Sequence, residues 1–287
     1  MLLHAGNASR SRAFALPLVV ILSMVATMAI AVMLERQGHQ TRSTIRQMRW
    51  TQDRHLERGV REVAGAWLTS ASRRLNDIAK EGGHALDLTM GGGRTIRLDV
   101  EDAQGSILSV FDGVSESEMP FAQGAYDSVL MRAGDEATLD RWTRTVGPVA
   151  ISAMTAPEEV IAAAVAPMIG DGQASALARD VVLAREDVDG ERGTQWLRRV
   201  IADYATEMED RRTMQRLLVG EPDLWRLQIS VLDGRGRVGS MYEAIVEVDG
   251  REIRQRADSG AFAPLGPFLL WRRMGEAEMV EYGARRR

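Results

Sequence analysis

The sequence predicts an α+β fold: a long N-terminal helix, first apolar and then amphipathic, packed on an antiparallel sheet that carries an inserted helical subdomain. Three observations predict it. An uncharged run of 21 residues lies near the N-terminus, apolar residues at helical spacing follow it, and alternating strand patterns flank a block of helices. Because 45% of the 287 residues are hydrophobic, the chain can bury a core.

The boundaries of the expected parts follow from these patterns. We expect a leader at 1–13, a transmembrane helix at 14–34, an amphipathic helix at 35–82, a first β part at 83–150, the helical subdomain at 151–218, and antiparallel strands with a tail at 219–287.

The run from Phe14 to Leu34 contains no charged residue. A helix of this length is about 30 Å long, which matches the hydrocarbon core of a bilayer. Core helices of soluble proteins rarely run so far without a charge. We therefore expect one membrane span with a soluble body behind it.

Three fates of this span are compatible with its residues. Ala29-Ile30-Ala31 has the form of a signal-peptidase site, although the apolar run is longer than usual and continues beyond it. The span can also be a plain uncleaved anchor. Third, the polar start with Arg10 and Arg12, followed by Ala13 and then Phe14, has the form of a prepilin leader. A cut between Ala13 and Phe14 keeps the helix in the mature protein.

Charge is distributed unevenly along the chain. Residues 1–80 hold 12 basic and 5 acidic groups, whereas the remainder holds 24 basic and 35 acidic groups. A basic anchor region suits an anionic bilayer, and an acidic body argues against nucleic-acid binding. Five arginines follow the span, so a positive-inside count places its C-terminal side in the cytoplasm. The prepilin interpretation requires the reverse orientation.

A stripe of apolar residues at steps of three and four predicts that the helix continues beyond the span. The stripe packs on the body's own sheet or also within a filament, and Gly82-Gly83 ends it. Its members are Ile45, Met48, Leu56, Val60, Val63, Trp67, Ala71, Leu75 and Ile78.

The body is expected to begin and end with strands. Residues 95–100 alternate as a strand, with 106–111 as its hairpin partner, and 112–145 show no firm pattern. Helices are expected at about 157–167, 173–185 and 194–216. A closing meander is expected at 227–231, 241–248 and 252–257, with a turn at Asp249-Gly250.

This layout resembles the K-type minor pseudopilin of the type II (general) secretion pathway along nearly the whole chain. Arg12–Leu18 is similar to the peptidase site of that family, and Val100–Leu108 is similar to one of its strand-turn motifs. Val149–Val160 resembles the entry to its inserted helices, and the strands from Leu227 resemble its C-terminal sheet.

Some positions depart from the family pattern. Ala13 stands where the family usually has glycine, and Ser152 and Met154 stand where it has asparagines. Most pseudopilins carry a glutamate five residues into the mature chain. Leu18 occupies that position here, as is typical of K-type members, although an unrelated anchored protein would lack the glutamate too.

The resemblance implies a non-enzymatic structural subunit at the tip of a pseudopilus, anchored in the bacterial inner membrane with its body in the periplasm. It implies as partners other minor pseudopilins, inner-membrane components of the secretion system, and the prepilin peptidase. The alternative is a single-pass anchored envelope protein whose body binds a partner outside any filament.

Residue types argue against an anchored hydrolase. The chain has no cysteine, and its four histidines (His4, His39, His55 and His84) lie in the first third. Asp187, Asp189 and Glu191 form the one candidate calcium site, and K-type pseudopilins bind calcium in their globular part. The series of an EF-hand is incomplete, so a solvated acidic loop is the simpler interpretation. No other cofactor is indicated.

Overall fold

The computed structural model of the chain describes residues 10–186, 194–205, 207–248, 268–275 and 278–279, with side chains from Leu18 onward. Internal contacts divide the chain into two units, one ending at Gly59 and the other starting at Val60. One helix, α1 (Arg10–Ala71), contributes to both units. The predicted α+β class with a long N-terminal apolar helix is confirmed.

The second unit begins with the last turns of α1, whose buried residues include Val60, Ala64 and Leu68. Residues spaced by four form a ridge that is inclined to the helix axis, and such a ridge packs into a groove of the neighbouring element. Val60, Ala71, Leu75 and Ile78 of the predicted stripe are buried as expected. Val63 and Trp67 are only half-buried, so between Val60 and Ala71 the residues that face the core, Ala64 and Leu68, are shifted by one position from the predicted ones.

The expected helix over 35–82 is interrupted. A 3₁₀ turn, η1 (Ser72–Arg74), separates α1 from the short helix α2 (Leu75–Lys80). Gly83 then turns the chain into the sheet with a φ of +78°, and a Cβ at this position would lie 2.6 Å from the carbonyl oxygen of Val100. Glycine is therefore required where the helix ends, because any side chain would collide with the neighbouring strand.

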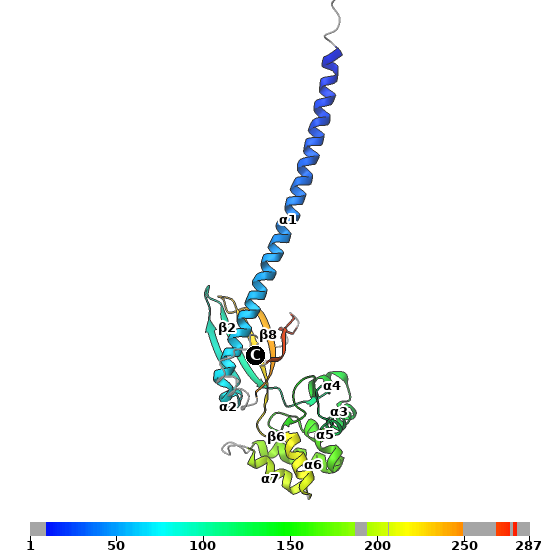
Figure 1. Ribbon diagram of the computed structural model, residues 1–287, viewed down its shortest axis with the longest axis vertical. Helices are drawn as coiled ribbons and strands as arrows, with labels where there is room; N and C mark the ends of the chain where they lie inside the picture. Colours follow the sequence, from blue (N-terminus) through cyan, green and yellow to red (C-terminus); the bar gives the residue numbers. More distant parts are fainter. Residues whose placement is uncertain (1–9, 187–193, 206, 249–267, 276–277, 280–287) are drawn as a thin grey trace, which may run out of the picture. The chain divides into compact units, whose positions relative to one another are not determined.

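The strands of the second unit form one antiparallel sheet in the order β1-β2-β7-β8-β9. The end of α1 and α2 lie across it in Figure 1. The strand bounds are His84–Thr89 for β1, Thr95–Asp102 for β2, Leu224–Leu232 for β7, Val238–Glu247 for β8 and Phe268–Arg273 for β9.

Opposite faces of the sheet differ in polarity. Leu98, Ile229 and Tyr242 are paired across three strands and are almost fully buried. The next row is polar and runs through Asp99, Gln228, Glu243 and Arg272 on four neighbouring strands. Since side chains on adjacent positions of a strand point to opposite faces, one face is apolar and the other carries charged and amide groups.

Two strand predictions are corrected by this topology. The strand at 95–100 exists as β2, but its neighbours are β1 and β7, and residues 106–111 are not its hairpin partner. Instead β3 (Ile107–Leu108) pairs in parallel with β4 (Thr143–Arg144). β1 was not predicted from the sequence, because four of its six residues are exposed and its polar residues, His84, Asp87 and Thr89, do not alternate regularly with apolar ones.

The strands at the end of the chain also differ in part from the predicted meander. β7 and β8 correspond to the predicted first two strands of the meander, and β9 occupies the free edge of β8. The predicted strand at 252–257 and the turn at Asp249-Gly250 lie outside the described residues.

The helices between β2 and β7 gather in one group, separate from the five strands in Figure 1. Their bounds are Met119–Ala133 for α3, Glu136–Trp142 for α4, Glu158–Ile169 for α5, Asp171–Glu186 for α6, Gln195–Tyr204 for α7 and Met208–Leu217 for α8. Residues Val160–Val165 of α5 are all buried, so α5 is the central helix of the group.

The helical subdomain therefore starts earlier than the predicted residue 151. Helix α3 shares one hydrophobic core with α5, α6 and α7, through residues such as Val129, Ile161, Leu177 and Trp196. Helix α5 runs through Pro167 to Ile169 rather than stopping at the proline. The expected helix at 194–216 is two helices, α7 and α8. A second parallel pair, β5 (Ile151–Ser152) with β6 (Leu218–Val219), joins the segment before α5 to the segment after α8.

Candidate functional site: an uncovered apolar helix and the sheet–helix junction

The apolar part of α1 is exposed over its described length. From Leu18 to Leu34 the large side chains are 47–73% exposed, with Met28 the most exposed at 73% and Val32 the least at 47%. The most apolar window has a mean hydropathy of 2.4, and none of it is buried. Within the described residues this is one helix that is long and apolar enough to cross a membrane.

The few polar groups in this stretch are satisfied internally. The hydroxyl of Ser23 donates to the Val20 carbonyl (2.8 Å), and the hydroxyl of Thr27 donates to the Ser23 carbonyl (2.7 Å). In hydrocarbon every polar group needs a partner within the protein, so back-bonded hydroxyls are compatible with lipid contact. The predicted processing residues Ala13 and Phe14 belong to α1, but their side chains lie outside the described part.

The two body segments that carry the pseudopilin resemblance meet at the junction between the sheet and the helical subdomain. Gln104 follows β2 and is 1% exposed. Its Nε2 donates to the carbonyl of Ala150 (2.9 Å). Its Oε1 accepts from the backbone N–H groups of Asp223 (2.8 Å) and Leu224 (3.2 Å), at the start of β7. One buried amide therefore connects three chain segments.

Adjacent residues strengthen the same junction. The Oδ1 of Asp102 accepts from the backbone N–H of Gln104 (2.7 Å), and its Oδ2 accepts from the hydroxyl of Thr155 (2.7 Å). Gly105 lies so close to Thr155 that an added Cβ would be 2.6 Å from the hydroxyl oxygen. The junction is thus fixed by hydrogen bonds and by a close approach that requires glycine.

Replacement of Gln104 by alanine is expected to destabilise the protein by about 2–4 kcal/mol, because it removes the acceptor of the buried N–H of Leu224 and of the part-buried N–H of Asp223. The measurement is urea unfolding of the full-length chain in detergent. Gln173→Ala is the matched control, since Gln173 is exposed on α6 and its loss is expected to change stability by less than about 0.5 kcal/mol. Similar effects of both substitutions would contradict the role of Gln104.

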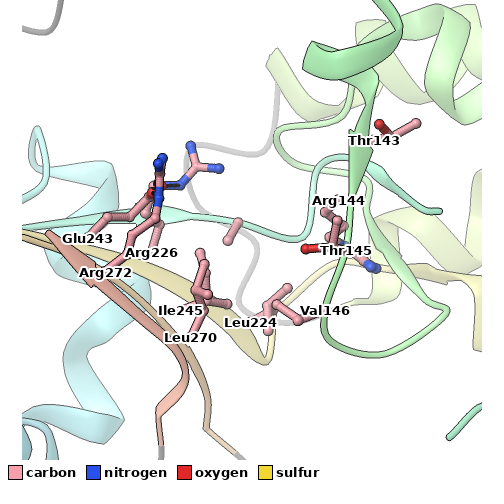
Figure 2. Close-up of a pocket in the computed structure, with 11 residues that line it drawn as sticks. Thr143, Arg144, Thr145, Val146, Leu224, Arg226, Glu243, Ile245, Leu270 and Arg272 are labelled. Atoms are coloured by element: carbon pink, nitrogen blue, oxygen red, sulfur yellow. Dashed lines mark hydrogen bonds and ion pairs between the residues drawn. The ribbon is translucent and has the colours of Figure 1, made fainter. Parts of the chain in front are cut away.

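A recess of about 260 Å³ lies next to this junction. Figure 2 shows Arg226, Glu243 and Arg272 on one side of it and Thr143, Arg144 and Thr145 on the other. Its apolar lining residues are Ala103, Val146, Leu224, Ile245 and Leu270.

The arginines on the sheet side of the recess already have carboxylate partners. Arg272 donates to Glu243 (2.6 Å) and to Glu278 (2.7 Å), and Arg226 Nε lies 3.0 Å from Glu243 as an ion pair without hydrogen-bond geometry. Burial lowers the pKa of Arg272, but the hydrogen bonds to Glu278 and Glu243 outweigh it and raise the pKa overall. These charges therefore hold β7, β8 and β9 together.

Arg144 on the opposite side is largely enclosed. Burial lowers its pKa to about 10, and Asp102 and Glu247 offset only part of this effect. Its guanidinium donates to the carbonyls of Pro148 and Ala150, and in Figure 2 it points away from the Arg272 side. Arg144 therefore fixes the loop before β5, and the lining of the recess contains no histidine that could act as a general base.

The candidate metal ligands are not described. Asp187, Asp189 and Glu191 lie outside the described residues, so the calcium site stays a prediction. Among the residues that the structure does describe, no group of three or more His, Cys, Asp or Glu side chains could hold a metal ion. His84 pairs instead with Asp99, at 3.2 Å between Nδ1 and Oδ1.

Fold and site together define a class: an α+β body built on the end of a helix that is apolar enough to span a membrane. No protein-family model matches the sequence, and no curated protein matches it. Among solved structures, the chain is similar to a chain in the crystal structure of the GspK-GspI-GspJ complex from the type 2 secretion system of enterotoxigenic Escherichia coli. The identity is 10%, the TM-score is 0.48, and the match covers 81% of this chain and 99% of that chain.

Proposed function

We propose that the protein is a non-enzymatic structural subunit of a type II secretion system, a K-type minor pseudopilin at the tip of the pseudopilus. The helix α1 is anchored in the bacterial inner membrane and the body lies in the periplasm. After the prepilin peptidase removes residues 1–13, Phe14 is the new N-terminus. The partners are other minor pseudopilins and inner-membrane components of the secretion system.

One observation carries this proposal. A single continuous helix supplies both the uncovered apolar stretch up to Leu34 and the buried residues Val60, Ala64 and Leu68 of the body. The anchor is therefore an extension of a core helix of the body rather than a separate element joined by a linker. An apolar helix that leaves lipid needs an equally apolar environment, which the core of a helical filament provides.

Two further features favour the K type among pseudopilins. The helices α3–α8 are inserted between neighbouring strands of the sheet, β2 and β7. The motif segments around Gln104 and Ala150 meet at the point of insertion. Leu18 occupies the position at which most pseudopilins carry glutamate, and a subunit without that glutamate suits the end of a filament.

The decisive experiment reads the mature N-terminus by mass spectrometry of protein from the native host. We expect Phe14, and we expect Ala13→Asp to retain the leader and to abolish secretion, because the peptidase needs a small residue before the cut. Asn7→Asp is the matched control: it adds the same charge within the leader but away from the cut, and processing should continue. An N-terminus at Met1 would support the plain anchor, and one after Ala31 a removed signal peptide.

A further inference from the structure

A cluster of charged and imidazole side chains lies at the free edge of the sheet, on β1 and β2. It consists of two pairs of residues that face each other across these strands, His84 with Asp99 and Asp87 with Arg97. None of the four lines the recess beside Gln104. We call these four residues the edge cluster.

A β-bulge in β1 brings the two pairs of the edge cluster onto one face. Residues three positions apart in a regular strand point to opposite faces of a sheet. Between His84 and Leu86 the pairing register shifts, since β1 advances by two residues there. Their partners in β2, Asp99 and Leu98, are consecutive. His84 and Asp87 therefore lie on the same face despite their spacing, and bulges at sheet edges commonly re-aim side chains in this way.

Asp99 fixes the orientation of the imidazole in this cluster. The side chain of Asp99 is 1% exposed, and its Oδ1 lies 3.2 Å from Nδ1 of His84. A carboxylate can only accept, so in the neutral imidazole Nδ1 carries the proton and donates it, and Nε2 keeps its lone pair. The side chain of His84 is 52% exposed. Donation from one ring nitrogen to a carboxylate is the arrangement in which histidine binds metal ions through the other nitrogen.

Asp87 offers a second ligand atom on the same side. Its Oδ1 is 3.9 Å from Nε2 of His84, and its side chain is 40% exposed. Arg97 donates from Nε to Oδ1 and from Nη2 to Oδ2, each at 2.9 Å, and these hydrogen bonds lower the pKa of Asp87. Each carboxylate oxygen has two lone pairs, so Oδ1 keeps one of them for a metal ion.

The distances suit a divalent cation of the first transition row. A tetrahedral ion about 2.1 Å from both ligand atoms holds them about 3.4 Å apart, so an approach of about 0.5 Å by the exposed Asp87 is sufficient. An imidazole nitrogen beside a carboxylate oxygen favours Zn²⁺ over Ca²⁺ and Mg²⁺, which take oxygen ligands. We propose that His84 and Asp87 form an exchangeable Zn²⁺ site, with Asp99 as its positioning residue and water in the remaining coordination positions. This site depends neither on membrane anchoring nor on filament assembly.

The test is an NMR titration of Zn²⁺ into the full-length chain in detergent near neutral pH, with isotope-labelled histidine rings assigned through His84→Gln and His39→Gln. The ring nitrogens of His84 are expected to shift at a Zn²⁺ concentration about tenfold or more below that needed for His39. His39 is the internal reference, because its Nε2 lies 4.0 Å from Glu35 but no carboxylate among the described residues holds its Nδ1. Nδ1 of His84 should keep its proton when Zn²⁺ is bound, and Ca²⁺ should shift neither ring.

Two substitutions separate the ligand from the positioning residue. Asp99→Asn should weaken the binding of Zn²⁺ at His84 about 10–100-fold, the range for loss of a carboxylate behind a metal-binding histidine. Asp87→Asn removes a ligand and should weaken binding by at least about tenfold. Asp140→Asn is the matched control, because it makes the same chemical change at an exposed side chain of α4 and should leave the titration of His84 unchanged.

Equal Zn²⁺ dependence of His84 and His39 in the wild-type chain would overturn the proposal. So would an effect of Asp87→Asn no larger than that of Asp140→Asn. Since the side chain of Asp87 is exposed, this comparison also decides the question if Asp99→Asn disturbs the sheet. Transfer of the His84 proton from Nδ1 to Nε2 on addition of Zn²⁺ would contradict the positioning role of Asp99.

Discussion

Two aspartates in the middle of the apolar run, Leu22→Asp with Val25→Asp, are expected to abolish stable membrane insertion. An aspartate at the centre of a membrane helix costs about 2.5–3.5 kcal/mol, and the loss of two aliphatic residues adds to this. The total is roughly 6–8 kcal/mol of insertion free energy. Extending the span by a few neighbouring residues of α1 could not recover this much. Leu22 and Val25 are 69% and 62% exposed, so the substitutions remove no internal packing.

Alkaline carbonate extraction of membranes measures this effect. The wild-type chain should stay in the membrane pellet, and the double variant should appear in the supernatant or be degraded. Gln37→Asp with Gln40→Asp is the matched control, because it introduces two aspartates at the same spacing of three residues but outside the run. If the variant at positions 22 and 25 remains in the pellet like the control, the run does not hold the chain in lipid.

Leu68→Ala is expected to destabilise the body by about 2–5 kcal/mol, the range for a leucine removed from a packed core. Leu68 is 1% exposed in the last turns of α1. Leu183→Ala on α6 is the same chemical change at a side chain that is 56% exposed, and its expected effect is below about 0.5 kcal/mol. Urea unfolding of the full-length protein in detergent, followed by tryptophan fluorescence, compares the two.

The outcome of the comparison between Leu68→Ala and Leu183→Ala bears on function as well as on stability. If Leu68→Ala destabilises the body strongly, the end of α1 is part of its core, and force on the anchor is transmitted directly to the sheet. Equal effects of the two substitutions would mean that α1 is only loosely attached. The proposal that one helix serves as anchor and as core element would then lose its physical basis.

Local patterns in the sequence were sufficient to predict several elements of the fold. The apolar run, the strand at 95–100 and the helix beginning near residue 157 depend on composition and spacing over short stretches. α3 was missed because Gly124 weakens its helical pattern, and its burial comes from contact with α5 rather than from its own periodicity.

The candidate site was only partly predictable. Both segments of the junction were identified as motifs, but their contact was not, because Gln104 and Leu224 are 120 residues apart in the chain. An isolated glutamine carries no signal of burial in a single sequence.

By itself the sequence determined that this protein has one apolar helix of membrane-spanning length, an acidic body and an α+β order of elements, since these follow from the nature and spacing of neighbouring residues. Only the tertiary structure decided that β2 lies between β1 and β7, that Ala64 and Leu68 rather than Val63 and Trp67 face the core, and that the helical group begins at α3. These features depend on which distant surfaces bury one another, and the free energy of that burial is shared between segments that no local pattern connects.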